Sequence, residues 1–321
     1  MRTYIIRRLA QMVPVFLGIM LILFLLLQLA PGGPTGMLMD PRMSAEQKQE
    51  LAEKYGENKP FYEKFISWMA DAAKGNFGNS ITHKKPVVEV IKDFIGNTFL
   101  LAIVSLLVGL FIGVPIGIVS ATKQYSAVDY GTTIFSLIGV SLPAFFFGLL
   151  LLKIFAVELP WFPIFGLTNP LLRKADWIVR AIDKAHHLVL PVTVLGLTQA
   201  ASFMRYTRSS MLEVIRQDYV RTARAKGLRD KVVIYKHAFR NAMIPIITLL
   251  GFSIPGLISG ALMTETIFSL PGLGKISVEA VGQRNYPLIL GINAMLSIVT
   301  LLSALIADLL YATADPRIRY D

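Results

Sequence analysis

Long uncharged runs alternate with short charged segments along this chain of 321 residues. A helix needs roughly 20 residues to cross the hydrocarbon core of a bilayer. Five of the runs exceed that length and one, 187–204, is at its short end. The pattern therefore predicts an all-α polytopic membrane protein with six transmembrane helices. The runs cover residues 9–39, 94–122, 130–152, 187–204, 241–264 and 285–307.

The first run follows Arg2, Arg7 and Arg8, as the apolar region of a signal peptide would. Its apolar stretch is longer than the usual length of about 7–15 residues, and Ala30-Pro31-Gly32 is a poor cleavage site. We therefore expect a retained membrane helix over residues 9–30.

Basic residues orient the predicted helices. Residues 205–240 hold ten basic and three acidic side chains, whereas residues 31–93 hold nine of each and the turn 123–129 is near neutral. Cytoplasmic loops carry an excess of Lys and Arg, so we expect 205–240 and both termini in the cytoplasm. The loop 158–186, with four basic and three acidic residues, does not decide the orientation.

The expected organisation has five parts. These are a cytoplasmic N-terminus (1–8), a first span (9–30), an extracytoplasmic loop with short amphipathic helices (31–95), a core of five spans (96–312) that includes the loop 205–240, and a cytoplasmic tail (313–321).

The loop 31–95 is predicted to hold two helices. Ser44-Ala-Glu-Gln47 has the form of a capping box and predicts a helix to about Tyr55. A second helix from about Pro60 carries an apolar stripe. That stripe either rests on the membrane or the bundle, or contacts a soluble extracytoplasmic partner. Its residues are Phe61, Phe65, Trp68 and Met69.

Small residues and prolines punctuate the spans. A ladder at four-residue spacing lets a neighbouring helix approach closely: Ser105, Gly109, Gly113, Gly117 and Ala121. Proline removes a backbone donor, so we expect kinks at Pro115 and Pro143 and a break near Pro255. Broken helices either line a pathway or are ordinary kinks.

Motifs of enzymes are absent from the sequence. His186-His187 lacks the Glu of a zinc-protease helix, and no Walker A sequence occurs. There is no cysteine for a disulfide or thiolate site. Because the basic residues flank spans, membrane topology explains the high pI better than a nucleic-acid partner does. Glu265 and Asp308, near the span ends, are open to a pathway role or to simple interfacial placement.

The loop 205–240 predicts a helical elbow. Helix propensity is high from about Met211 to Lys226, Gly227 suits a left-handed cap, and a second helix follows from about Lys231. Small residues in the first helix would permit docking in a groove of a partner. The alternative is a basic loop lying on anionic lipid.

This loop resembles the EAA loop of ABC-importer permeases, with Ala223 and Gly227 at the positions of the motif's second Ala and its Gly. Arg221 replaces the Glu and Thr222 the first Ala, and the usual Ile-x-Leu-Pro end is not kept. These departures resemble the B-type permeases of dipeptide/oligopeptide importers. The likeness extends over nearly the whole chain, and its motifs are Tyr4–Arg8, Ala30–Gly32, Gly75–Ser80, Asn97-Thr98, Ser141–Pro143, Tyr219–Leu228, His237, Arg240–Ala242, Pro245, Glu265–Phe268, Pro271–Gly274 and Ala314–Arg317.

The resemblance implies a type I ABC-importer transmembrane subunit in a bacterial or archaeal cytoplasmic membrane. Its partners would be a homologous second permease, two ATPase subunits that bind ATP and Mg, an extracytoplasmic solute-binding protein and a peptide substrate. The chain itself would bind no cofactor or metal, and no nucleic acid. The ATPase-coupling residues that the resemblance implies are Tyr219, Arg221, Ala223, Arg224, Ala225, Gly227, Leu228, His237, Arg240 and Asn241. The candidates for the translocation pathway are Asn97, Ser141, Pro143, Gln199, Met204 and Glu265.

Two kinds of alternative stay open. The same subfamily includes importers of nickel, glutathione and oligosaccharides. From another class, the chain could be a stand-alone secondary carrier or channel.

Overall fold

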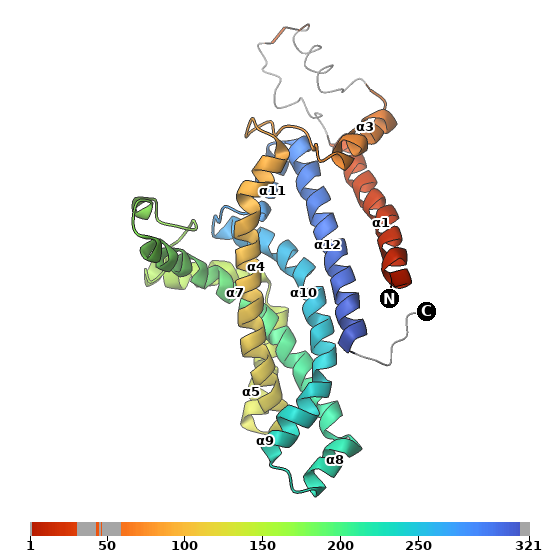
Figure 1. Ribbon diagram of the computed structural model, residues 1–321. Helices are drawn as coiled ribbons and strands as arrows, with labels where there is room; N and C mark the ends of the chain where they lie inside the picture. The colour runs from red at the N-terminus through yellow and green to blue at the C-terminus, as the bar shows by residue number, and fades with distance from the viewer. Residues whose placement is uncertain (1, 31–42, 45, 47–58, 315–321) are drawn as a thin grey trace. The chain divides into compact units, whose positions relative to one another are not determined.

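The computed structural model describes residues 2–30, 43, 44, 46 and 59–314, without the side chains of 2, 252, 254–260 and 310–314. It divides into two compact units, Met1–Gly96 with Gly272–Leu301, and Asn97–Pro271 with Leu302–Tyr320. The described residues form helices, joined by turns and one isolated bridge between Asn79 and Pro86 (Figure 1). The predicted helix from Ser44 to about Tyr55 lies almost entirely outside the described residues.

The first unit holds α1 (Arg2–Leu29), α3 (Phe61–Ala73), α11 (Leu273–Gly282), the part of α4 (Val87–Thr122) up to Gly96 and the part of α12 (Tyr286–Ala314) up to Leu301. The stripe on α3 packs against α1, with the ring of Phe24 centred 5.6 Å from Phe65 and 6.2 Å from Trp68. Met20 of α1 is buried in the same cluster. The stripe therefore rests on the chain's own bundle, the first of the two alternatives.

A buried amide holds the loop before α4 in this unit. Asn285, which is fully buried, donates from Nδ2 to Ser80 Oγ at 2.8 Å and to Thr82 Oγ1 at 2.9 Å, and its Oδ1 accepts from the Ile81 amide at 3.2 Å. Before that loop, Gly75 and Gly78 both have positive φ. Gly272, the N-cap, leads directly into α11.

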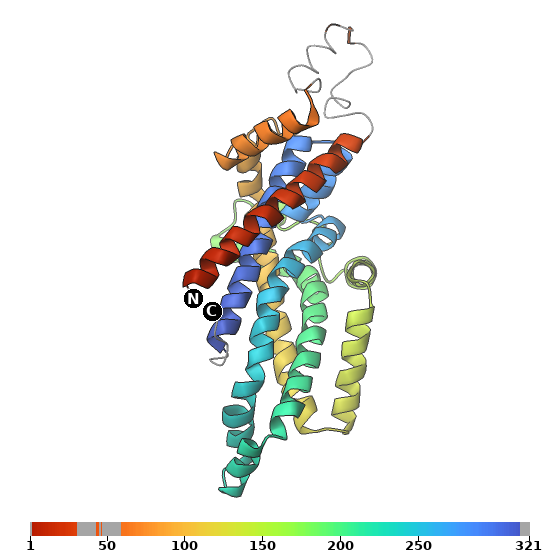
Figure 2. The same cartoon turned by 90° about the vertical axis from the view of Figure 1, so that its right-hand side faces the viewer.

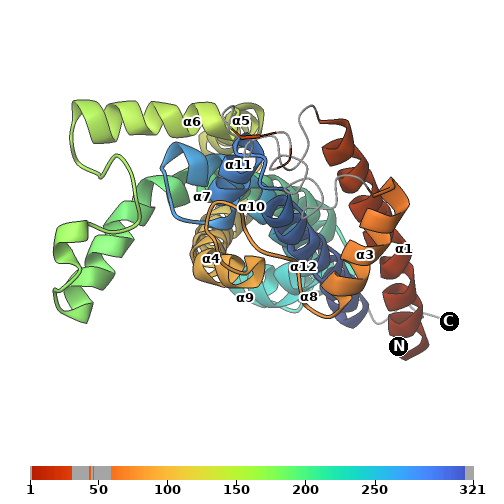
Figure 3. The same cartoon turned by 90° about the horizontal axis from the view of Figure 1, so that it is seen from above.

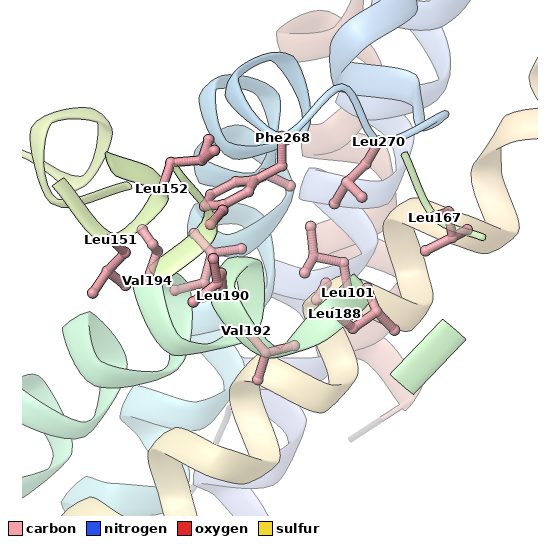
Figure 4. Packing of buried hydrophobic residues seen from close by; sticks show 14 residues of the cluster. Leu101, Leu151, Leu152, Leu167, Leu188, Leu190, Val192, Val194, Phe268 and Leu270 are labelled. Carbon is pink, nitrogen blue, oxygen red and sulfur yellow. The ribbon is translucent and has the colours of Figure 1, made fainter. Parts of the chain in front are cut away.

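The second unit contains the rest of the described helices. They are α5 (Ala127–Ser141), α6 (Ala144–Leu151), η1 (Leu152–Glu158), η2 (Pro170–Leu172), α7 (Trp177–Ile215), α8 (Asp218–Ala225), α9 (Asp230–Val232), η3 (Val233–Ala238) and α10 (Phe239–Ile267). Helices α4, α7 and α10 run side by side (Figures 1 and 2). Their apolar core includes Leu101, Val194 and Phe268, shown in Figure 4.

The predicted third span is bent at Pro143. Helix α5 and the helical stretch Ala144–Glu158 meet at 102°, so α6 extends sideways from α5 (Figure 3). Leu142 is extended, with φ −78° and ψ 121°, because the ring of a proline disfavours helical backbone in the residue before it. Helix α4 continues through Pro115. The break expected near Pro255 is wrong, since α10 is one helix from Phe239 to Ile267.

Among the described residues, four helices are long and apolar enough to cross a membrane, and the bent pair would make a fifth. The run 241–264 lies within α10, whose middle side chains are not described. A total of six spans therefore remains a prediction.

The small-residue ladder of α4 allows the close approach of a neighbouring helix that its spacing predicted, and that helix is α7. A Cβ added at Gly109 would lie 2.6 Å from Gln199 Cβ, one at Gly113 2.5 Å from the Ala200 carbonyl oxygen, and one at Gly117 2.7 Å from Thr207 Cβ. All three distances are shorter than real Cβ contacts. Only glycine therefore fits at these three positions of the contact between α4 and α7, which we call the α4–α7 seam.

Candidate functional site

The expected elbow is present, but its first helix begins later than predicted. Helix α7 continues to Ile215, Gln217 is extended (φ −73°, ψ 148°), and α8 starts at Asp218. One helix from Met211 to Lys226 would place Met211 and Val220 on opposite sides, since nine residues make about two and a half turns. The break at Gln217 lets both side chains enter one apolar cluster.

Helix α8 has one buried and one exposed face. Val220 and Ala223 are buried among Ile118 and Ala121 of α4, Met211 of α7, Val233 and Ala238 of η3, and Ala242 of α10. We call these eight residues the α8 seat. The outward residues are Tyr219, Arg221, Arg224, Ala225, Gly227 and Leu228. Ala223, expected at a partner contact, instead lies on the inner face because the seat needs a small apolar side chain there.

Gly227 ends the elbow's first helix as the sequence predicted. Its φ is +75°, in the left-handed region, and its amide donates to the Arg224 carbonyl at 2.9 Å. Nothing lies within 4 Å of a Cβ added there. The constraint on Gly227 is therefore backbone conformation, whereas the glycines of the α4–α7 seam are constrained by space.

The charges of α8 are weakly engaged. Arg221 Nη1 lies 3.5 Å from Asp218 Oδ1, and Arg224 Nε lies 3.5 Å from Asp230 Oδ1. All four side chains are well exposed, and such pairs contribute little to stability. Both guanidinium groups therefore remain accessible to an acidic surface.

The remaining predicted coupling residues lie beyond α8. His237 is half-buried in the π-helical segment η3, and its carbonyl accepts from Asn241 Nδ2 at 3.3 Å. Arg240 and Asn241 are exposed at the start of α10. Ser210 Oγ donates to the Ala242 carbonyl at 3.0 Å and so joins α7 to α10 behind the elbow. These residues form the base of the elbow, while α8 forms its tip (Figure 1).

The six pathway candidates fall into three places. Asn97 donates to the Pro271 carbonyl at 2.7 Å, and the adjacent Thr98 donates to Glu265 Oε1 at 2.6 Å. Glu265 is thereby buried between α4 and α10. Two more candidates, the buried Met204 and the half-buried Gln199, lie on α7, while Ser141 and Pro143 lie exposed at the α5–α6 bend.

A buried ion pair was missed from the sequence. Asp129, in the first turn of α5, is 3% exposed, and its carboxylate accepts from Arg208 Nε at 2.6 Å and Nη2 at 2.9 Å. Ser120 Oγ of α4 also donates to it, at 2.5 Å. The near-neutral charge of the turn 123–129 concealed this residue. A single acid at the start of an apolar helix, opposite a basic loop, is the signal that could have identified it.

Comparison with known proteins agrees with this arrangement. The family model for the binding-protein-dependent transport system inner membrane component matches residues 113–320. The oligopeptide transport system permease AppB of Bacillus subtilis is 43% identical over the full length of both chains. The dipeptide transport system permease DppB of Escherichia coli K12 is 35% identical over 100% of this chain and 99% of its own.

Solved structures show the same fold at low identity. A chain of the inward-facing MetNI methionine ABC transporter aligns with a TM-score of 0.54 and 17% identity, over 71% of this chain and 97% of its own. A chain of an amino acid ABC transporter with histidines aligns with a TM-score of 0.52 and 13% identity, over 70% of this chain and 94% of its own. The predicted type I importer fold is confirmed. The chain belongs to the family of binding-protein-dependent transport system inner membrane components.

Proposed function

We propose that this chain is a permease subunit of an ATP-driven, binding-protein-dependent importer of di- or oligopeptides. The names of the relatives AppB and DppB support the peptide substrate. It would pair with a homologous second permease and two ATPase subunits, and would receive peptide from an extracytoplasmic binding protein.

The observation that carries the proposal is the division of α8 into two faces. Its inner face is held by the α8 seat, while its outer face presents Tyr219, Arg221 and Ala225. A helix seated on the inner ends of α4, α7 and α10 is placed to convey an external displacement to all three. An outer face that is basic and includes the small residue Ala225 suits a cleft with acidic walls.

In this mechanism ATP closes the partner ATPase dimer and displaces α8. The α8 seat conveys the displacement to α4 and α7, which pack closely against each other along the α4–α7 seam. Pathway opening then exposes the substrate route to the binding protein. ATP and Mg stay on the partner subunits, and this chain supplies the mechanical connection and half of the route.

Reconstitution tests the proposal. The chain, its second permease and both ATPase subunits are placed in proteoliposomes with the binding protein and labelled peptides, with nickel, glutathione and an oligosaccharide as competing substrates. We expect uptake of peptide that requires ATP and all subunits. Uptake of another substrate alone would correct the substrate class, and transport by the chain without ATPase subunits would contradict the importer.

A further inference from the structure

The buried carboxylate of Asp129 joins three helices. Besides the two bonds from Arg208 of α7 and one from Ser120 of α4, its Oδ2 accepts from the Tyr125 amide at 3.0 Å. Tyr125 has a φ of +63°, which the tight turn between α4 and α5 requires. The carboxylate therefore ties the start of α5 to α4, to α7 and to the turn itself. We call Asp129, Arg208 and Ser120 the inner clamp.

Helix α5 packs against α7 along one face and leaves its other face exposed. Its outward side chains are apolar and exposed, with Ile134 57%, Leu137 55% and Ile138 57% exposed. At the other end of α5, Gly139 lies close to α7, since a Cβ there would be 2.8 Å from Ala201 Cβ. The inner clamp is thus the charged link of α5 to α7, and it lies at the end opposite the bend at Pro143.

The inner clamp and the α8 seat share the same turn of α4. Ile118 and Ala121 belong to the seat, and Ser120 lies between them. On α7, Arg208 precedes the last residue, Ile215, by seven residues, or about 10 Å of helix. A displacement of α8 therefore reaches Asp129 through both helices over a short distance.

We propose that Asp129 and Arg208 are a positioning pair that makes α5 move with α4 and α7 when α8 is displaced, and so carries the motion to the bend at Pro143. This inference rests on the proposed function, because it concerns how that importer couples ATP hydrolysis to opening. Guanidinium and carboxylate bonded through two parallel N–H groups fix orientation as well as distance, which a mechanical link requires.

The test uses the complete complex with three variants. Asp129→Asn keeps the shape of the side chain but removes its charge, and the exchange D129R/R208D restores opposite charges in reversed order. Glu213→Gln, an exposed acid on α7, is the matched control. The measurements are peptide uptake per assembled complex and ATP hydrolysis with and without peptide-loaded binding protein.

We expect Asp129→Asn to assemble and to hydrolyse ATP at the basal rate, while uptake and stimulation by the binding protein fall about tenfold. The exchange should restore a large part of both, and the control should change neither. If Asp129→Asn showed the same peptide uptake and the same stimulation of ATP hydrolysis as Glu213→Gln, the proposal would be overturned. A lower yield of complex with normal activity per complex would also overturn it, since the pair would then serve assembly alone.

A distance measurement separates this inference from the proposed function. The chain has no native cysteine, so spin labels can be attached at Tyr130→Cys on α5 and Arg205→Cys on α7, both of which are exposed. When the partner subunits are cysteine-free, the distance between these two labels reports the position of α5 relative to α7. With Asp129 present, we expect one narrow distance that ATP does not alter, and with Asp129→Asn a broader distribution. Equal widths would overturn the pair's role even if peptide is transported. Failure of the wild-type complex to import peptide would instead overturn the proposed function.

Discussion

The α4–α7 seam and the α8 seat are two ways of holding a helix, and they suit different tasks. In the seam, glycines bring one helix against the backbone of the other, with 2.5 Å between a Cβ added at Gly113 and the Ala200 carbonyl oxygen. In the seat, the buried residues of α8 are Val220 and Ala223, and the helix is bounded by turns at Gln217 and Gly227. From this difference we expect the seam to move as a block and α8 to tilt within its seat.

The difference suggests a division of work within the second unit. Close packing transmits displacement without loss because interiors have few voids to absorb it. A short helix that is buried on one face can instead follow a partner that approaches its other face. We therefore expect substitutions in the seam to disturb stability and those around α8 to disturb coupling.

The largest effect is expected in the seam. Gly113→Leu would force α4 from α7, and overpacking of this kind costs typically about 1–3 kcal/mol and occasionally more. Thermal unfolding in detergent and the yield of assembled complex measure it. Gly131→Leu on α5 is the control, since a Cβ there has nothing within 4 Å. Equal effects of both substitutions would contradict the account of the seam.

Gly227→Pro should abolish most transport while membrane insertion remains normal. Proline holds φ near −65°, which is incompatible with +75°, so α8 would be re-aimed although its side chains are unchanged. Peptide uptake and surface labelling of the assembled complex measure the two quantities. Unchanged uptake would mean that the elbow is not the transmission element.

Val220→Ala should loosen α8 in its seat. Burial of a valine side chain contributes about 1.5–3 kcal/mol, and part of it is lost with two methyl groups. Hydrogen exchange of the α8 amides should accelerate, with a smaller reduction of uptake than Gly227→Pro causes. Leu228→Ala, at a residue 41% exposed, is the control, and equal acceleration by both would contradict the seat.

The smallest effect on stability is expected from Arg221→Ala. Both side chains of its ion pair with Asp218 are exposed, and exposed ion pairs contribute little to stability. We expect no measurable change in thermal unfolding, together with a weaker and less salt-dependent association of the ATPase subunits. A clear fall in unfolding temperature would show that Arg221 serves the fold and not the partner contact.

Local rules predicted the features that depend on one residue or one spacing. The glycine ladder of α4, the left-handed Gly227 and the bend at Pro143 follow from backbone chemistry and are present. The break at Gln217 could not be predicted from propensity, because it reconciles side chains of different helices in the α8 seat. The pairing of Asp129 with Arg208, 79 residues apart, depends on tertiary packing, as does the inward position of Ala223.

The central claim is that the outer face of α8 docks in an ATPase subunit, and cysteine cross-linking tests it most directly. One cysteine replaces Ala225 on the exposed face or Val220 on the buried face, and a second lies in the cleft of a cysteine-free ATPase subunit. The account predicts a cross-link from position 225 that stops peptide uptake, and none from position 220. Absence of a cross-link at 225 in an assembled complex, or equal cross-linking at both positions, would contradict it.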